Sequence, residues 1–267
     1  MSSEFRAPVT LSPSRANDFK SCPLKYRYRV IDKLPEPTSS AQVKGTLVHS
    51  VLERLYDLGA AERTSGRALE LVEPEWKRLR DADAEAAGVV DDESAWIAEV
   101  RKLVEAYFAV EDPRRLQPAE RECLVEATTA DGVRLKGYID RLDVAPTGEI
   151  RVVDYKTGGV PREAFRAEAL FQLKFYAVAL WHVRGVVPTV LRLIYLKDGQ
   201  AIDYSPTEAE LRATERNITA LWRAIGEAVT RGDFRAKKSG LCGWCHFKDR
   251  CPEFGGTPPP YPLPITV

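Results

Sequence analysis

The chain has 267 residues, and its 39 Lys and Arg balance 39 Asp and Glu, so the formal net charge is zero. Balanced charge removes a global basic field as a sign of nucleic-acid binding, although a local groove can still be basic. No long apolar run and no signal-peptide core stand in the sequence, so we expect a cytoplasmic protein without a membrane span. In that reducing compartment, five cysteines indicate metal binding or catalysis before disulfides.

The first half of the sequence is predicted to be mainly helical. A capped helix is expected from Ser12 to Cys22, because Ser and a following Pro are typical of a helix start. Apolar residues at helical spacing predict a second helix over about 41–58, with Gly59 at its end. The charged segment from about 61 to 118 is interpreted as a helical insertion that caps a core.

Strand patterns dominate the middle of the chain. Three strands are expected at 121–128, 133–145 and 149–157, then a helix at 163–184, a strand at 189–197 and a helix at 206–231. This order predicts an α/β fold with one mixed central sheet flanked by helices. We expect a single domain over 1–267 that ends in a proline-rich tail at 257–267.

The hairpin "GYIDRLDVAPTGEIRVVDYKTG" carries charged residues that a strand does not need for stability. Side chains alternate along a strand, so Asp154 and Lys156 share one face. Asp140 precedes Asp154 by fourteen positions, with the turn midway between them and Asp140 expected at the end of its strand. The two carboxylates are therefore predicted to meet across an antiparallel strand pair.

Two neighbouring carboxylates repel each other unless a cation lies between them. Mg²⁺ binds one or two carboxylates together with water and substrate phosphate, and Lys156 could hold a water or neutralise a phosphate oxygen. Such a group suits metal-assisted hydrolysis of a phosphodiester. The alternative is a half-buried surface hairpin with solvated charges, in which Lys156 merely pairs with Asp154.

Three further side chains are candidates, although each has an ordinary structural interpretation. His49 lies on the helix predicted at 41–58, and Glu53, one turn later, could orient it. Gln172 and Tyr176 are one turn apart on the helix predicted at 163–184. Taken singly, the histidine is typical of a partly buried helix residue, and the Gln–Tyr pair of surface decoration.

The motifs "GTLVH", "GYIDRLD", "VVDYKTG" and "QLKFYA" stand in this order between about Ser12 and Cys251. In combination they resemble the RecB-type branch of the PD-(D/E)XK nucleases, which implies a restriction-endonuclease-like fold. The resemblance implies that the metal ligands are His49, Asp140, Asp154 and the Tyr155 carbonyl. It further implies that Lys156 is the catalytic lysine, and that Gln172 and Tyr176 position the DNA and the site.

Four of the five cysteines form a pattern of their own. Cys242, Cys245 and Cys251 read C-x₂-C-x₅-C, and Cys22 lies far upstream, a set that suits either tetrahedral zinc or an iron–sulfur cluster. The pattern resembles the 4Fe–4S staple of iron–sulfur RecB-type nucleases, such as the AddB nuclease domain and CRISPR-associated exonucleases. Zinc, with His246 as a substitute ligand, is the minority alternative. Cys123 is interpreted as a small buried apolar residue.

Basic and aromatic residues surround these cysteines in sequence. They could form a basic rim with stacking surfaces for single-stranded DNA. The basic residues are Arg15, Lys20, Lys25, Arg27, Arg29, Lys237, Lys238, Lys248 and Arg250, and the aromatic ones are Tyr26, Tyr28 and Trp244.

The function expected from the sequence is a Mg²⁺- or Mn²⁺-dependent DNA nuclease with a 4Fe–4S cluster. We expect an exonuclease that acts on single-stranded DNA or DNA ends in repair or recombination. No G-x-x-x-x-G-K-[ST] motif is present, so unwinding would need a separate helicase partner. The alternatives are an iron–sulfur DNA-binding or assembly module without turnover, and a zinc-stabilised nuclease.

Overall fold

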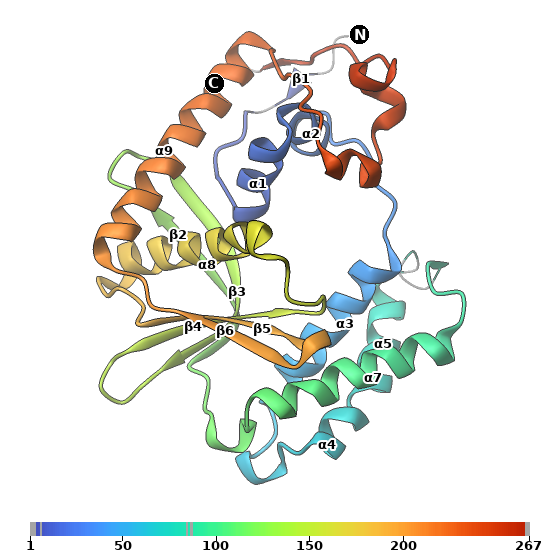
Figure 1. The fold of residues 1–267 in the computed structure, drawn as a ribbon, viewed down its shortest axis with the longest axis vertical. Coiled ribbons are helices and arrows are strands. Elements are labelled where there is room, and N and C mark those ends of the chain that lie inside the picture. Colours follow the sequence, from blue (N-terminus) through green and yellow to red (C-terminus); the bar gives the residue numbers. More distant parts are fainter. Residues whose placement is uncertain (1–3, 6, 84, 86–87, 265–267) are drawn as a thin grey trace. The chain divides into compact units, whose positions relative to one another are not determined.

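The main sheet has five strands in the order β2-β3-β4-β5-β6 (Figure 1). The computed structural model describes residues 4–5, 7–83, 85 and 88–264. The strands are β2 (Glu120–Thr128), β3 (Arg134–Val144), β4 (Ile150–Lys156), β5 (Val190–Tyr195) and β6 (Gln200–Tyr204). β4 runs parallel to β5. β3 pairs antiparallel with β4, and β6 pairs antiparallel with β5. The mixed sheet is therefore confirmed, and β6 is a strand that the sequence analysis missed.

The chain divides into two units, each built from separate sequence segments. The sheet unit comprises Thr38–Val125 and Tyr138–Glu208, and the terminal unit comprises the described parts of Met1–Pro37, Glu126–Gly137 and Ala209–Val267. All candidate residues of the predicted metal site belong to the sheet unit. The four patterned cysteines belong to the terminal unit.

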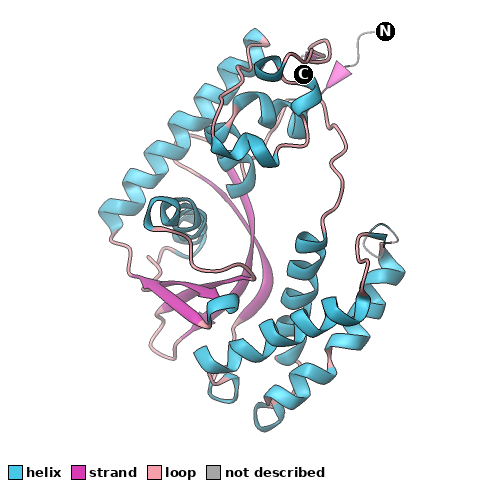
Figure 2. Cartoon of the chain, turned by 45° about the vertical axis from the view of Figure 1, so that its right-hand side comes forward, coloured by secondary structure: helices cyan, strands magenta, loops and turns pink. Residues whose placement is uncertain are grey.

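Helices flank both faces of the sheet within the sheet unit (Figure 2). The helices are α3 (Ser40–Leu55), α4 (Ser65–Glu70), α5 (Val72–Ala82), α7 (Glu93–Val110) and α8 (Glu163–Arg184), with short 3₁₀ turns η2 (Ala60–Glu62), η3 (Pro113–Arg115) and η4 (Leu196–Asp198). Val153 and Tyr155 pack into a core with α3 and α7, whereas Asp154 contacts Gln172 of α8. Alternation along β4 thus sends successive side chains to opposite helical layers.

β4 is buried on both faces, since five of its seven residues are buried and the other two are half-buried. This corrects the expectation of a half-buried hairpin. The reason is the parallel pairing with β5, which places β4 inside the sheet between two helical layers.

The helices between 61 and 118 form as expected, but they contribute to the core and do not merely cap it. Trp76 of α5 and Trp96 of α7 are buried against each other, and Val104 packs into the same cluster as Leu47 of α3. α3 itself begins at a capping box made by Ser39 and Gln42 and ends at Leu55. Its end at Leu55 corrects the expected helix end at Gly59.

The terminal unit contains α1 (Pro13–Ser21), α2 (Pro23–Tyr26), the π-helical η1 (Arg27–Ile31) and the long α9, described from Glu208 to Arg231. The cysteine-rich segment contains three 3₁₀ turns, η5 (Gly240–Trp244), η6 (Lys248–Arg250) and η7 (Pro252–Phe254). β1 (Glu4–Phe5) pairs with β7 (Leu263–Pro264). The hydroxyl oxygen of Ser12 accepts the backbone N–H of Arg15, so the predicted cap of the first helix is confirmed.

Two of the proposed stacking residues are core residues. Tyr26 and Tyr28 are buried, and they stack or pack edge-on against Phe234 and Phe247. Arg27 is also buried, where it pairs with Asp32. The expected stacking surface loses both tyrosines and the basic rim loses Arg27, because the end of α2 and the π-helical turn η1 direct these side chains inward.

Among the described helices, none combines the length and the apolar character that a membrane crossing requires.

Candidate metal centre and cysteine pocket

The predicted meeting of Asp140 and Asp154 follows from the register of β3 and β4. Arg141 lies opposite Val153, so the next positions outward are Asp140 and Asp154. The strand pair opens there, and the backbone N–H of Tyr155 donates to Asp140 Oδ2 at 2.7 Å. Asp140 lies within β3, which corrects its expected place at the strand's end.

Burial and the neighbouring charge of Asp154 raise the pKa of the Asp140 carboxyl well above its ordinary value. Two carboxylates in this position favour either a proton or a cation.

His49 reaches the same point from α3. Its Nε2 lies 2.9 Å from the Tyr155 carbonyl oxygen, which can only accept, so Nε2 carries the proton. In this tautomer the lone pair of Nδ1 faces Asp140 Oδ2 at 3.5 Å. Burial lowers the pKa of His49, which favours the neutral imidazole that a metal ion requires. The contacts of His49 are thus with Tyr155, Asp140 and Glu122, and the expected orientation by its helix neighbour Glu53 stays a prediction.

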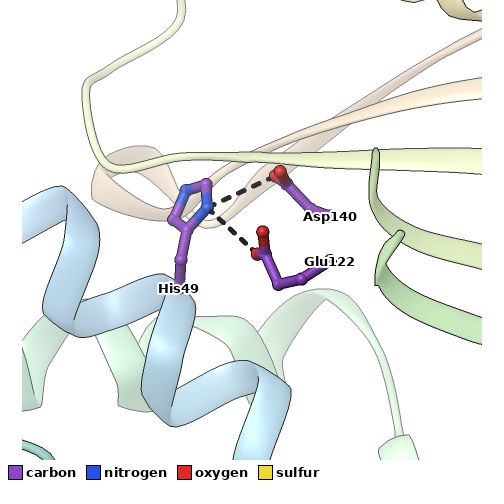
Figure 3. A group of neighbouring side chains, drawn as sticks. All are labelled: His49, Glu122 and Asp140. Atoms are coloured by element: carbon purple, nitrogen blue, oxygen red, sulfur yellow. Dashed lines mark ion pairs between the residues drawn. The ribbon is translucent and has the colours of Figure 1, made fainter. Parts of the chain in front are cut away.

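Glu122 of β2 completes the group and was missed in the sequence (Figure 3). Its Oε1 lies 3.8 Å from His49 Nδ1, and the ligand atoms of His49, Glu122 and Asp140 all lie within 4.8 Å of one another. Burial, followed by the charges of Glu53 and Asp154, raises the pKa of Glu122 to about 7. The sequence motifs give no signal for it, because one glutamate in a strand matches no spacing rule.

The backbone of Glu122 is unusual as well. Its φ is 43°, a left-handed conformation that is uncommon for a residue other than glycine. Such strain persists where the surrounding structure holds it, often at a functional site.

Lys156 and Gln172 form a connected group with Asp154. Lys156 Nζ lies 2.6 Å from Asp154 Oδ2 and donates to Gln172 Oε1 at 2.8 Å. Gln172 Nε2 in turn donates to Asp154 Oδ1 at 2.9 Å and to the Tyr176 hydroxyl at 3.0 Å. Burial raises the pKa of Tyr176, so its hydroxyl stays neutral. The Gln–Tyr pair is therefore part of this group and is not surface decoration.

The donor set at this point fits a divalent cation. Asp154 is only 2% exposed, and its Oδ2 has the ion pair with Lys156 but no hydrogen-bond partner among the described residues. Asp154 lies outside the group of His49, Glu122 and Asp140 whose ligand atoms are within 4.8 Å of one another, but its charge acts on the pKa of both Glu122 and Asp140. Oxygen ligands therefore dominate the set, with one imidazole nitrogen from His49. Mg²⁺ and Mn²⁺ both take carboxylate oxygens.

An open pocket of about 490 Å³ borders this group at His49 and Glu122, whereas Asp140 and Asp154 are not among its lining residues. Its lining includes His49, Glu122 and Glu53, together with Arg78 of α5. A second pocket in the same unit, of about 510 Å³, is lined by Lys44, Lys102, Lys197 and Thr157, with Glu99 as its one acidic residue among those described. Thr157 directly follows Lys156 in the chain, so positive charge gathers beside the end of β4.

The four patterned cysteines line one pocket of about 230 Å³ in the terminal unit. The backbone N–H of Lys237 donates to Cys22 Sγ at 3.4 Å, and that of Ser239 donates to Cys242 Sγ at 3.3 Å. Burial, together with the charges of the other three thiolates, raises the pKa of Cys251.

The four sulfurs share this pocket but are not clustered. Within the described part of the chain, no three of them form a group with ligand atoms within 4.8 Å of one another. A tetrahedral zinc with Zn–S bonds of about 2.3 Å would hold all four about 3.8 Å apart.

Cys123 lies on β2 in the sheet unit and is not among the residues that line the cysteine pocket. It is half-buried, whereas a buried position was expected. Burial raises the pKa of its thiol to about 11, so the thiolate that a metal needs is disfavoured there.

Comparison with known families assigns the chain. A model described as the PD-(D/E)XK nuclease superfamily matches residues 10–252, nearly the whole length. The chain belongs to this superfamily. Its nucleases use divalent metals, and the His49, Glu122 and Asp140 group could hold one, so the protein is a metal-dependent nuclease.

Individual proteins are similar to the chain as well. The Gene 69 proteins of Mycobacterium phages L5 and D29 are each 26% identical to the chain, over 290 and 272 residues, and each match covers 91% of this chain and 96% of the phage protein. A solved structure from Eubacterium rectale, provisionally named an exonuclease, matches with a TM-score of 0.59 at 12% identity and covers 89% of this chain and 87% of that one. At this identity the likeness shows the fold alone.

Proposed function

We propose that this nuclease is a RecB-type DNA exonuclease that acts on single strands or DNA ends, with Mg²⁺ or Mn²⁺ as its cofactor. The observation that carries the proposal is the convergence of His49, Asp140, Asp154 and Lys156 at the end of β4. These side chains come from three sequence motifs, and three separate elements bring them together.

The metal ligands in this proposal are His49, Asp140 and Asp154, with Glu122 and the Tyr155 carbonyl beside them. A bound divalent ion would polarise the scissile phosphate and lower the pKa of a water. Asp140 is held by the Tyr155 N–H, and His49 by the Tyr155 carbonyl, so the backbone of one residue orients both side chains.

Lys156 is proposed to assist proton transfer at the attacking water or to neutralise a phosphate oxygen. Its Nζ is held between Asp154 Oδ2 and Gln172 Oε1, which fixes the ammonium beside the metal ligands. Gln172, anchored to the Tyr176 hydroxyl, keeps both Lys156 and Asp154 in place. Gln172 and Tyr176 therefore act through Asp154 and Lys156.

DNA as the substrate is supported by local charge, because the global charge is zero. The pocket of Lys44, Lys102 and Lys197 beside Thr157 offers positive charge for phosphates. Trp244, 83% exposed at the cysteine pocket, offers a surface on which a base could stack.

The substrate is tested with end-labelled single-stranded and linear duplex DNA, and with closed circular DNA followed by gel mobility, each with and without Mn²⁺. We expect products released from ends and an intact circle. Cutting of the circle would make the protein an endonuclease. DNA binding without any cleavage would favour the iron–sulfur DNA-binding module without turnover.

Salt dependence tests the lysine pocket. The Lys156→Ala variant is expected to bind DNA with strongly reduced cleavage. Its affinity for single-stranded DNA should fall steeply as the salt concentration rises. Adding Lys102→Ala and Lys197→Ala should reduce the log–log slope by about 0.7 for each lost phosphate contact. The matched control is Lys77→Ala, an exposed lysine of α5 that lines neither pocket. An unchanged slope in the double variant would exclude this pocket as a DNA contact.

For the cysteine pocket we propose a 4Fe–4S cluster held by Cys22, Cys242, Cys245 and Cys251. The four share one pocket, and their C-x₂-C-x₅-C pattern with one remote cysteine resembles that of iron–sulfur RecB-type nucleases. The cluster would have a structural role, because it would join the first helices to a segment more than two hundred residues later. Iron and sulfide analysis of anaerobically purified protein tests this, and zinc without iron would establish the zinc-stabilised alternative.

The cellular setting is also part of the proposal. A cytoplasmic role in DNA repair or recombination, with unwinding by a separate helicase, fits a nuclease whose sequence contains no phosphate-binding loop of the Walker type. The partner is tested by asking whether a helicase co-purifies with the tagged protein. Leaving that helicase out of a nuclease reaction on duplex DNA should then reduce cleavage.

A further inference from the structure

Arg141 is a completely buried charge directly behind the candidate metal site. It follows Asp140 on β3, so alternation turns it toward the opposite face of the sheet, where its exposed fraction is 0%. An arginine at such a place is costly unless every one of its N–H groups has a partner.

The guanidinium of Arg141 meets this condition. Its Nη1 donates to the hydroxyls of Tyr155 at 2.8 Å and of Tyr56 and Tyr107 at 3.1 Å each. Its Nη2 lies 2.8 Å from Glu111 Oε2, and its Nε lies 3.1 Å from Asp143 Oδ1. The planar fork thus contacts three hydroxyls and two carboxylates at once, an arrangement that only arginine can make.

These partners tie together the elements that carry the proposed metal ligands. Tyr56 caps the end of α3, the helix of His49, and Arg141 itself neighbours Asp140 on β3. Tyr155 lies on β4 between Asp154 and Lys156. One buried guanidinium therefore fixes α3, β3 and β4 against one another.

Tyr155 connects the two sides of the sheet. Its hydroxyl accepts from Arg141 on one face, and its backbone binds the metal-site side chains. The carbonyl accepts from His49 Nε2, and the N–H donates to Asp140 Oδ2. A shift of the Tyr155 ring would therefore move the backbone groups that orient both side chains.

We propose that Arg141, acting through the Tyr155 hydroxyl, is a positioning residue for the metal site. It sets the spacing of His49, Asp140 and Asp154 before any metal binds, although it touches neither metal nor substrate. This inference rests on the proposed metal-dependent function.

The matched pair Tyr155→Phe and Tyr107→Phe separates positioning from stability. Each variant removes one buried hydroxyl from the same guanidinium, and the Tyr107 hydroxyl also contacts the Tyr56 hydroxyl at 2.5 Å and donates to Glu111 at 3.3 Å. Tyr107→Phe is therefore the stricter control for lost stability. Tyr107 lies on α7, which supplies no proposed ligand, whereas Tyr155 lies on the ligand-bearing strand. The pair also avoids substitution of Arg141 itself, which would remove the buried cation from Glu111 and Asp143 and leave them only the partly exposed Arg151 and Arg192.

The readouts are the melting temperature without metal and the Mn²⁺ affinity of the full chain, measured by calorimetry without DNA. We expect Tyr107→Phe to lower the melting temperature at least as much as Tyr155→Phe, but roughly 10–100-fold weaker Mn²⁺ binding only for Tyr155→Phe, as for other lost partners of metal ligands. High Mn²⁺ should recover cleavage in that variant.

Two results would overturn the inference. Equal Mn²⁺ affinity in both variants and the wild type would make Arg141 merely structural and leave the metal site intact. Absence of Mn²⁺ binding to the wild type would remove the metal site, and the proposed function with it.

Discussion

The metal site of the sheet unit and the cysteine pocket of the terminal unit differ in how far the fold has prepared them. At the metal site, the side chains of His49, Asp140 and Asp154 are each held by a hydrogen bond or ion pair at 2.9 Å or less. At the cysteine pocket, Cys22 and Cys242 each accept one backbone N–H, and no three of the four sulfurs, all in the described part of the chain, lie within 4.8 Å of one another.

This difference indicates two ways of building a site. The metal site takes its geometry from strand register and a buried polar network, so a metal ion would bind at a preformed site. The cysteine pocket is carried by short 3₁₀ turns and irregular segments, so its ligand would itself provide much of the order. Removing a ligand residue should therefore affect chemistry in the first case and folding in the second.

The largest effect is expected from Asp154→Asn. The substitution keeps the shape of a buried side chain but removes the charge that holds the cation and Lys156. Mn²⁺ binding and DNA cleavage should be lost together, while the melting temperature of the metal-free protein changes little. The control is Asp203→Asn, whose partner is Arg192 at the sheet surface. Full cleavage by Asp154→Asn would contradict the prepared metal site.

Lys156→Ala should reduce cleavage by roughly 10²–10⁴-fold, the range of an assisting acid–base group. Lys156 is not a ligand, so Mn²⁺ and DNA should still bind. Cleavage rates over a Mn²⁺ titration, with calorimetry for the metal, check this. A parallel loss of metal binding would show that Lys156 holds the site together and has no role of its own in the chemistry.

Cys22→Ala should remove the colour and iron of anaerobically purified protein and lower its melting temperature. The reason is that the proposed cluster joins distant segments of the terminal unit. Cys123→Ala, the matched control in the sheet unit, should keep both the iron and the melting temperature. The ligand assignment is wrong if the Cys123 variant loses iron and the Cys22 variant retains it.

The smallest effect is a pH dependence of metal binding. Glu122, with its pKa raised to about 7, is protonated below that pH in the metal-free protein, and the raised pKa of Asp140 acts in the same direction. Protons compete with the metal, so Mn²⁺ affinity should rise as pH increases toward about 7. His49, whose pKa is lowered, is already neutral there.

The control for this pH effect is Glu122→Gln, which should bind Mn²⁺ several-fold more weakly and lose the part of the slope near pH 7. Calorimetric affinities at a series of pH values test both statements. The same slope in the variant would exclude Glu122 as a ligand.

Much of the fold could be predicted because local patterns were strong. The mixed sheet, the long helices and the opposition of residues 140 and 154 followed from periodicity and from the length of the hairpin. β6 was missed because Gln200–Tyr204 is short and mostly exposed, so it lacks an alternating apolar pattern. The burial of Tyr26 and Tyr28 could not be foreseen, because they pack against Phe234 and Phe247, far away in the sequence. Tyr28 also lies in a π-helical turn, which changes the side chains that face the core.

The candidate site, like the fold, could be predicted from the sequence only in part. Residues with motif spacing, such as Lys156 and Gln172, could be selected from the sequence, and the structure places them within hydrogen-bond distance. Glu122 and Arg141 could not be selected, since their roles depend on contacts between segments far apart in the chain. A lone glutamate on a strand and an arginine beside a motif aspartate carry no periodic signal.

The central claim, that the fold forms a metal site before metal arrives, is tested most directly by crystals soaked in Mn²⁺. Anomalous scattering should show a peak bounded by His49, Asp140 and Asp154, with Glu122 beside it, and the main chains of α3, β3 and β4 should match those of the metal-free crystal. A peak at another place, or a site that forms only after these elements move, would contradict this claim.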